Sequence, residues 1–234
     1  MHGMRPGTYP TNYPGTDIRY AALQQLHSLQ FVEAGLAAEA EGFDAYAIST
    51  LPDPALREIR SLLRIPVVGY GESAMLTACL LGARFSIVVF ISELTALLTE
   101  NAKRYGLADR LAGVSDAGFR FNDVLQGFAE PAPLIERFYD AARVQIAGGA
   151  EVIIPGEAPL CVLLASQGVS SVDGVPVLDS LSCWVKHAEM LVDLKRQSGV
   201  ERCQRGYFNE PPPRDRVEEL LQFYRIGAAS VASR

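Results

Sequence analysis

Residues 44–73, DAYAISTLPDPALREIRSLLRIPVVGYGES, alternate short apolar runs with polar turns in the order of a βαβ unit. The apolar run 45–48 is bounded on both sides, which is typical of a strand buried on both faces of a parallel sheet. The predicted strand is followed by Ser49 and Thr50 at its carboxyl end, and ligands of open α/β sheets bind at the carboxyl ends of strands. Asp53 is predicted as an N-cap with Pro54 at the first helical position, so that a helix N-terminus would favour an anion at the same place.

The same alternation of strand, polar turn and helix continues along the chain. A helix is predicted over residues 21–41, closed by Gly42, and a C-terminal amphipathic helix after the proline run 211–213. Between them, the pattern predicts helices over 72–81 and 131–146, a further helix that ends at 105, and helical turns over 160–165. It predicts strands over 84–91, 111–119, 151–154 and 175–178. Candidate site residues follow three of these strands: Ser92 and Glu93, Gly156 to Ala158, and Asp179.

The two halves of the chain resemble each other in the order of their elements. Pro176 follows Pro66 by 110 positions, and Glu157 follows Thr50 by 107. Such self-similarity predicts two related α/β lobes, with residues 1–82 and 186–234 in the first and 83–185 in the second. The ends of corresponding strands would meet across a cleft, so that Thr50 and Glu157 oppose each other.

The composition of the chain limits the classes of protein to which it can belong. The chain has 234 residues, of which 49% are hydrophobic and 21% charged, and can bury a sizeable core. A net charge of −6 and a pI near 5.2 argue against nucleic-acid binding. No membrane-spanning or signal segment is visible, so the chain is interpreted as cytoplasmic. Its four cysteines show no CxxC spacing and its three histidines are scattered, which favours reduced thiols and no metal site.

The start of the chain, residues 1–17, is rich in Gly, Pro, Thr and Tyr. It is predicted to be an irregular loop, either a mobile flap over an active site or an ordinary terminal surface segment. His27, on the helix that follows, is interpreted as structural.

Four strings in the sequence resemble one known family. GFDAYAISTLPDPALREIRSLLRIPVVGYGESA, LGARFSIVVF, GGAEVIIPGEAP and GVPVLDSLSCWVKHAEML are similar to segments of the cofactor-independent aspartate/glutamate/hydantoin racemase superfamily. The resemblance implies two pseudo-symmetric flavodoxin-like lobes with parallel sheets and an active-site cleft between them. It also implies a substrate held between two catalytic cysteines, one of which removes a proton from carbon while the other returns one. Residues 2–4 resemble the end of the family's second strand, so either the sequence starts late or the first lobe is trimmed.

The sequence departs from this pattern at both cysteine positions. Alignment of the motifs puts Thr50 and Glu157 in the place of the two thiols. A threonine hydroxyl is scarcely ionised near neutral pH and cannot serve as one of two bases, although it can form a hydrogen bond. A partly desolvated carboxylate can have its pKa raised toward neutrality and act as a general acid or base. The alternatives are that Glu157 merely begins a helix, that Thr50 only caps the backbone, and that Cys161 is a displaced nucleophile.

Two classes of function follow from these residues. The first is a racemase-like enzyme that uses Glu157 on a small carboxylate, amide or cyclic ureide, as an isomerase, lyase or ring-opening hydrolase without a cofactor. The second is a catalytically silent relative that binds a small anion or a protein partner. The chain is expected to be a homo-oligomer. The residues predicted to gather around one pocket are Ser49, Thr50, Ser92, Glu93, Gly156, Glu157, Ala158 and Asp179.

Overall fold

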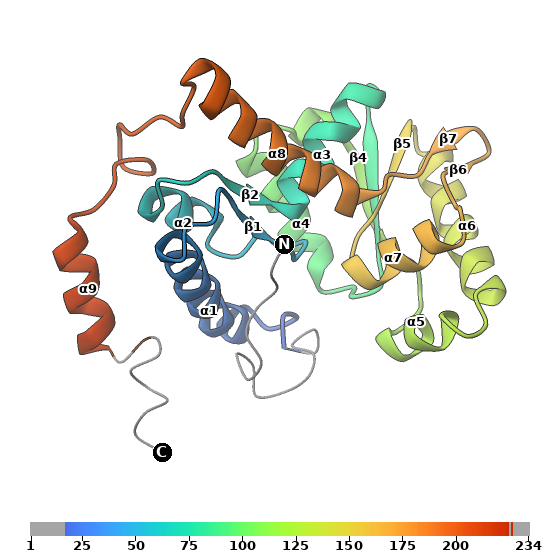
Figure 1. Ribbon diagram of the computed structural model, residues 1–234. Coiled ribbons are helices and arrows are strands. Elements are labelled where there is room, and N and C mark those ends of the chain that lie inside the picture. Colours follow the sequence, from blue (N-terminus) through green and yellow to red (C-terminus); the bar gives the residue numbers. More distant parts are fainter. Residues whose placement is uncertain (1–16, 225, 227–234) are drawn as a thin grey trace. The chain divides into compact units, whose positions relative to one another are not determined.

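The computed structural model describes residues 17–224 and 226, so the predictions for residues 1–16 lie outside the described residues. Helices and strands alternate along most of the chain (Figure 1). The helices are α1 (Ala21–Ala40), α2 (Leu56–Leu62), α3 (Tyr70–Leu81), α4 (Leu94–Arg104), the short 3-10 helix η2 (Ala108–Arg110), α5 (Phe121–Gly127), α6 (Ala132–Ala147), α7 (Ala158–Ser166), α8 (Ser180–Ser198) and α9 (Arg214–Phe223). The strands are β1 (Tyr46–Ile48), β2 (Val67–Gly69), β3 (Phe85–Val89), β4 (Leu111–Asp116), β5 (Val152–Pro155), β6 (Ser171–Val172) and β7 (Val175–Pro176).

Most of the predicted elements are confirmed within a few residues of their expected ends. The predicted end of the first helix at Gly42 is confirmed, since this glycine adopts a φ of +82° after α1. Gly106 and Gly168 adopt φ values of +75° and +69° after α4 and α7 in the same way. The predicted strand over 175–178 is shorter, because β7 forms an antiparallel hairpin with β6 and Val177 then bridges to Ile153. Helix α5 was not predicted, since it has only seven residues, of which Val124 and Gly127 alone are buried.

The chain divides into two compact units. The first contains the described residues of Met1–Ile48, Pro54–Val68 and Ala188–Arg234, and the second contains Ser49–Asp53 and Gly69–His187. The division expected from the sequence, at residues 82 and 186, puts the helix over 72–81 in the first lobe. In the structure this helix, α3, belongs to the second unit, where it packs against β5 and β3.

The first unit is built around α1. Helix α1 packs against α2 and β1, and Gly35 permits the close approach, because a Cβ there would lie 3.1 Å from Leu63 and 3.3 Å from Tyr46. The C-terminal helix α9 also contacts α1, because Arg214 forms an ion pair with Glu39.

The second unit contains a parallel three-stranded sheet in the order β4-β3-β5. Every residue of the central strand β3 is buried, which is typical of a strand with helices on both faces of its sheet. Helices α3 and α4 pack against the sheet, as do α6 and α7. The prediction of an α/β fold with parallel sheets is confirmed.

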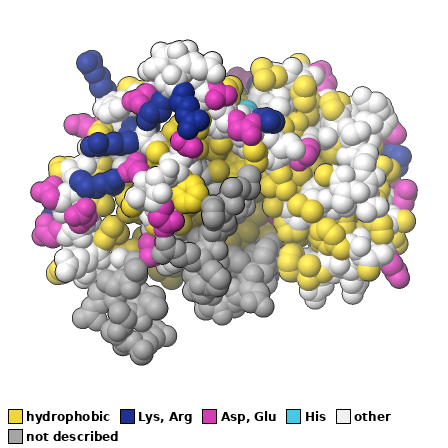
Figure 2. Space-filling view, in the orientation of Figure 1, with side chains coloured by type: hydrophobic (Ala, Val, Ile, Leu, Met, Phe, Trp, Pro, Cys, Tyr) yellow, Lys and Arg dark blue, Asp and Glu magenta, His cyan; other side chains and the backbone are white. Residues whose placement is uncertain are grey.

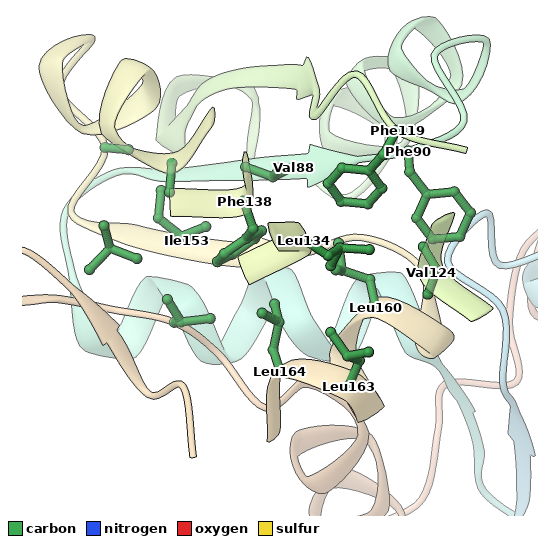
Figure 3. Packing of buried hydrophobic residues seen from close by; sticks show 14 residues of the cluster. Val88, Phe90, Phe119, Val124, Leu134, Phe138, Ile153, Leu160, Leu163 and Leu164 are labelled. Atoms are coloured by element: carbon green, nitrogen blue, oxygen red, sulfur yellow. The ribbon is translucent and has the colours of Figure 1, made fainter. Parts of the chain in front are cut away.

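One hydrophobic cluster fills the space between this sheet and helices α5 to α7 (Figure 3). Val88 and Ile153 supply the strand side, and Phe138, Leu160 and Leu164 supply the helix side. Side chains alternate between the two faces of a strand, so Ile87 and Ile154, which are also fully buried, face the opposite side of the sheet. The core therefore fixes β5 on both faces up to the residue at which the predicted site begins.

The surface of the second unit carries several exposed apolar side chains, among them Leu125, Phe128 and Val162. Hydrophobic side chains are numerous where Figure 1 places α5 to α7 (Figure 2). In the part of the chain that the structure describes, no helix is both long and apolar enough to cross a membrane.

The prediction that Asp53 caps the following helix is wrong. Helix α2 begins at Leu56, and its N-cap is Ala55, in a left-handed conformation with φ of 53° and no side-chain cap. The side chain of Asp53 instead accepts hydrogen bonds from the backbone N–H groups of Gly71 and Glu72, in the first turn of α3. The acid therefore caps a different helix, 18 residues further along the chain.

Candidate active site

Glu157 lies between the end of β5 and the start of α7. Its side chain is buried, with 4% of the residue exposed. The carboxylate accepts hydrogen bonds from the backbone N–H of Phe90, at 3.1 and 3.2 Å, and of Ile91, at 3.0 Å. These two residues follow β3, so a single acid joins the carboxyl ends of two neighbouring parallel strands. Ligand sites of open α/β sheets are found at this edge.

Burial raises the pKa of Glu157 from its usual 4.5 to about 7. The N–H groups of Phe90 and Ile91 lower the pKa, but by less than burial raises it, and the nearby charge of Asp116 raises it further. A group that titrates near neutral pH is present in both forms there, so it can accept a proton and return it. The geometry and the pKa together suit a general acid/base.

The loop that carries Thr50 reaches the same turn through Leu51. A Cβ on Gly156 would lie 2.8 Å from Val89 and 3.2 Å from the Leu51 side chain, so only glycine fits there without displacement. Thr50 is half-buried, and its carbonyl oxygen accepts the N–H of Asp53 at 3.0 Å. Its hydroxyl makes no hydrogen bond within residues 17–224 and 226, so it is not committed to capping the backbone there.

The other predicted site residues lie at the ends of the same strands. Ser92 and Glu93 are exposed and come directly after Ile91, whose N–H bonds Glu157. Ala158 is the first residue of α7, and Ser49, which precedes Thr50, is exposed. The structure therefore connects Glu157 to the turn after β3, and Gly156 to the loop after β1. That all eight residues surround one pocket stays a prediction.

Asp179 joins this region through Cys161, which lies one helical turn after Glu157. The Cys161 thiol is 3.7 Å from a carboxylate oxygen of Asp179, and the N–H of Ser182 donates to the same oxygen at 3.1 Å. Burial raises the pKa of the Cys161 thiol, which keeps it protonated. A buried, protonated thiol is a poor nucleophile, and this argues against Cys161 as a displaced catalytic group.

Three residues near the site were missed from the sequence. Asp53 was assigned to the wrong helix, Tyr105 donates its hydroxyl to Asp53 at 2.7 Å, and the hydroxyl of the buried Tyr70 lies beside Cys161. The side-chain partners just given lie 18 or more positions away in the sequence, so no local pattern would have revealed these contacts. Among the described residues, no three His, Cys, Asp or Glu side chains are grouped so that they could hold a metal ion.

These features define an α/β protein with a titratable acid at the carboxyl ends of parallel strands. A sequence profile of the family described as Asp/Glu/Hydantoin racemase matches residues 11–188. The chain belongs to this family.

Similar proteins agree with the assignment. A hydantoin racemase of Pseudomonas sp. (strain NS671) is 32% identical over 188 residues, which is 80% of this chain and 72% of the relative. A hydantoin racemase of Paenarthrobacter aurescens is 32% identical over 179 residues, or 76% of this chain and 72% of the relative. Among solved structures, the fold is similar to that of an allantoin racemase from Klebsiella pneumoniae, with a TM-score of 0.69 and 24% identity over 82% of this chain and 75% of the other. An allantoin racemase from Pseudomonas fluorescens gives a TM-score of 0.68 at 25% identity, covering 82% and 78%. The resemblance to the racemase superfamily seen in the sequence is thus confirmed.

Proposed function

We propose that this protein is a racemase-family enzyme that exchanges the proton on an activated carbon of a small cyclic ureide, with Glu157 as its single acid/base. The observation that carries the proposal is the placement of Glu157, buried at the junction of β5 and α7 with its pKa raised to about 7. The names of the similar proteins, hydantoin and allantoin racemases, support the class of substrate.

The proposed reaction begins at a ring carbon that bears a hydrogen next to a carbonyl group. The ionised carboxylate of Glu157 takes this proton and becomes a carboxylic acid, while the electron pair of the broken C–H bond moves into the ring as an enolate. Return of the proton to carbon regenerates the substrate and the carboxylate. The Thr50 hydroxyl is proposed to donate a hydrogen bond to the enolate oxygen, where negative charge develops.

A single acid/base predicts a stereochemical difference from the two-thiol mechanism that the family resemblance implies. Glu157 takes a proton from one face and returns it to the same face, whereas a threonine at position 50 cannot supply a proton to the other face. Inversion then requires protonation by water. Exchange of the ring hydrogen with solvent should therefore be faster than racemisation.

The test is to incubate the protein with one enantiomer of a 5-substituted hydantoin, or of allantoin, in deuterated water. NMR follows the loss of the ring hydrogen, circular dichroism follows inversion, and an enzyme-free sample corrects for the spontaneous reaction. Glu157→Gln should lower the exchange rate by ~10²- to 10⁴-fold, the usual contribution of positioned proton transfer. Glu136→Gln, which changes an exposed acid on α6, is the matched control and should leave the rate unchanged.

Three results would contradict the proposal. Full exchange in Glu157→Gln would remove the carboxylate from the mechanism. A ring-opened product or an elimination product would favour a hydrolase or a lyase. No exchange by the wild-type protein on either ureide would favour the silent relative, in which Glu157 only binds the amides after β3.

A further inference from the structure

The segment Ser49–Asp53, which carries Thr50, belongs to the second compact unit, although β1 and α2 on either side of it belong to the first. Asp53 and Ala55, near its end, have φ values of 50° and 53°, in the left-handed region. This conformation costs an L-residue free energy and persists only where its surroundings impose it. Specific contacts must therefore fix this loop.

The side chain of Asp53 makes three of these contacts. One carboxylate oxygen accepts the N–H of Gly71 at 3.0 Å, and the other accepts the N–H of Glu72 and the hydroxyl of Tyr105, both at 2.7 Å. The two N–H groups belong to the first turn of α3, and Tyr105 is the C-cap residue of α4. Asp53 is 3% exposed, so it faces the interior and is not itself placed to meet a substrate.

The backbone of the loop makes the remaining contacts. The side-chain amide of Asn101, a fully buried residue of α4, donates to the carbonyl oxygen of Pro52 at 2.9 Å. Gly71 leaves room for the loop, because a Cβ there would overlap the carbonyl oxygen of Leu51 and lie 2.9 Å from the Asp53 carboxylate. The residues immediately after Thr50 are thus held by α3 and α4 on one side and by Gly156 through Leu51 on the other.

We propose that Asp53, held by the first turn of α3 and by Tyr105, is a positioning residue that fixes Thr50 for catalysis. The inference rests on the proposed function for the role of Thr50, but the fixing of the loop is independent of it. The carboxylate binds two adjacent N–H groups at once, which defines the direction in which the chain leaves Thr50. Without these hydrogen bonds the left-handed turn is no longer fixed, and the hydroxyl of Thr50 loses its fixed position. Glu157 keeps its own hydrogen bonds.

The first experiment measures the loop directly and needs no substrate. Hydrogen–deuterium exchange, followed by mass spectrometry, is compared between wild type, Asp53→Asn and Tyr105→Phe. Asp53→Asn should speed exchange in peptides that cover residues 49–53 by tenfold or more, and Tyr105→Phe, which removes one of three bonds, should speed it by less. Peptides from β3 and α6 should not change. Tyr139→Phe, which alters a half-buried tyrosine of α6, is the matched control and should leave the loop as in wild type.

The second experiment asks whether Asp53 acts through Thr50. Asp53→Asn should lower kcat for proton exchange by about ten- to a hundredfold with little change in KM, and Tyr105→Phe by less. If Asp53 works by positioning Thr50, the double variant Thr50→Ala/Asp53→Asn should be no slower than the slower single variant. Losses that multiply in the double variant would overturn the inference.

The two proposals fail in different ways. Unchanged protection of residues 49–53 in folded Asp53→Asn overturns the positioning inference, whatever the activity. Full activity in Glu157→Gln overturns the proposed function but leaves the exchange result on the loop intact. If Asp53→Asn does not fold, Tyr105→Phe decides the matter, because unchanged loop protection in that variant also overturns the inference.

Discussion

The buried acid Glu157 should make the stability of this protein depend on pH in a specific way. Burial raises its pKa in the folded state to about 7, against 4.5 in an exposed chain. The folded state therefore binds the Glu157 proton more tightly than the unfolded chain does. This binding stabilises the folded state fully below pH 4.5, and the stabilisation is lost as the pH rises through 7. Each pKa unit corresponds to about 1.4 kcal/mol, so between pH 5 and pH 8.5 the titration of Glu157 should lower the free energy of unfolding by about 2–3 kcal/mol.

The substitution Glu157→Gln isolates this effect. Glutamine has nearly the same shape and resembles the protonated acid, because one oxygen still accepts hydrogen bonds and no charge is buried. The stability advantage of the variant over wild type should be small near pH 5 and should grow by about 2–3 kcal/mol between pH 5 and pH 8.5. Comparison with wild type at each pH is essential because other groups titrate in the same range. Burial also raises the pKa of Asp53 to about 7, and it lowers the pKa of His187, which acts in the opposite direction.

The measurement is urea unfolding at pH 5, 6, 7 and 8.5, followed by the fluorescence of Trp184, the single tryptophan of the chain. Midpoint and slope give the free energy of unfolding at each pH. Glu136→Gln, at an exposed position, should follow the wild-type curve. Parallel curves for Glu157→Gln and wild type would refute the reasoning, because they would mean that Glu157 is charged at no cost in the folded state.

Three further substitutions test other parts of the site. Thr50→Ala should slow proton exchange by roughly ten- to a hundredfold, since a hydrogen bond to a charged group contributes about 1.5–3 kcal/mol, and steady-state kinetics would show an unchanged kcat if the hydroxyl has no role. Gly71→Ala should destabilise the protein by ~1–3 kcal/mol, because the new methyl group overlaps the Leu51 carbonyl oxygen; an unchanged melting midpoint would show that the loop and α3 are further apart. Cys161→Ser should retain most of the exchange activity once folding is confirmed by circular dichroism, and abolition of activity by this change would revive a thiol mechanism.

The positions of most helices and strands follow from local features of the sequence. The apolar runs of β3 and β5 and the glycines after α1, α4 and α7 fixed those elements, because hydrophobic periodicity and left-handed glycines act over a few residues. The same local features placed Glu157 at the junction of a buried strand and a helix. Because glutamate is ionisable, its position alone predicted a titratable group there. Its hydrogen-bond partners, Phe90 and Ile91, lie more than sixty residues earlier and were not predicted.

Tertiary structure decided how the loop after β1 is held. The sequence Asp53-Pro54 favours a helix cap, and the nearest helix along the chain, α2, was therefore predicted to be the one that Asp53 caps. In the folded protein the carboxylate reaches Gly71 and Tyr105 instead, 18 and 52 positions away, where it accepts hydrogen bonds from the first-turn N–H groups of α3 and from the Tyr105 hydroxyl at once. A buried N–H without a partner is costly wherever it lies along the chain, so the choice between two helix starts depends on which one packing brings to the acid.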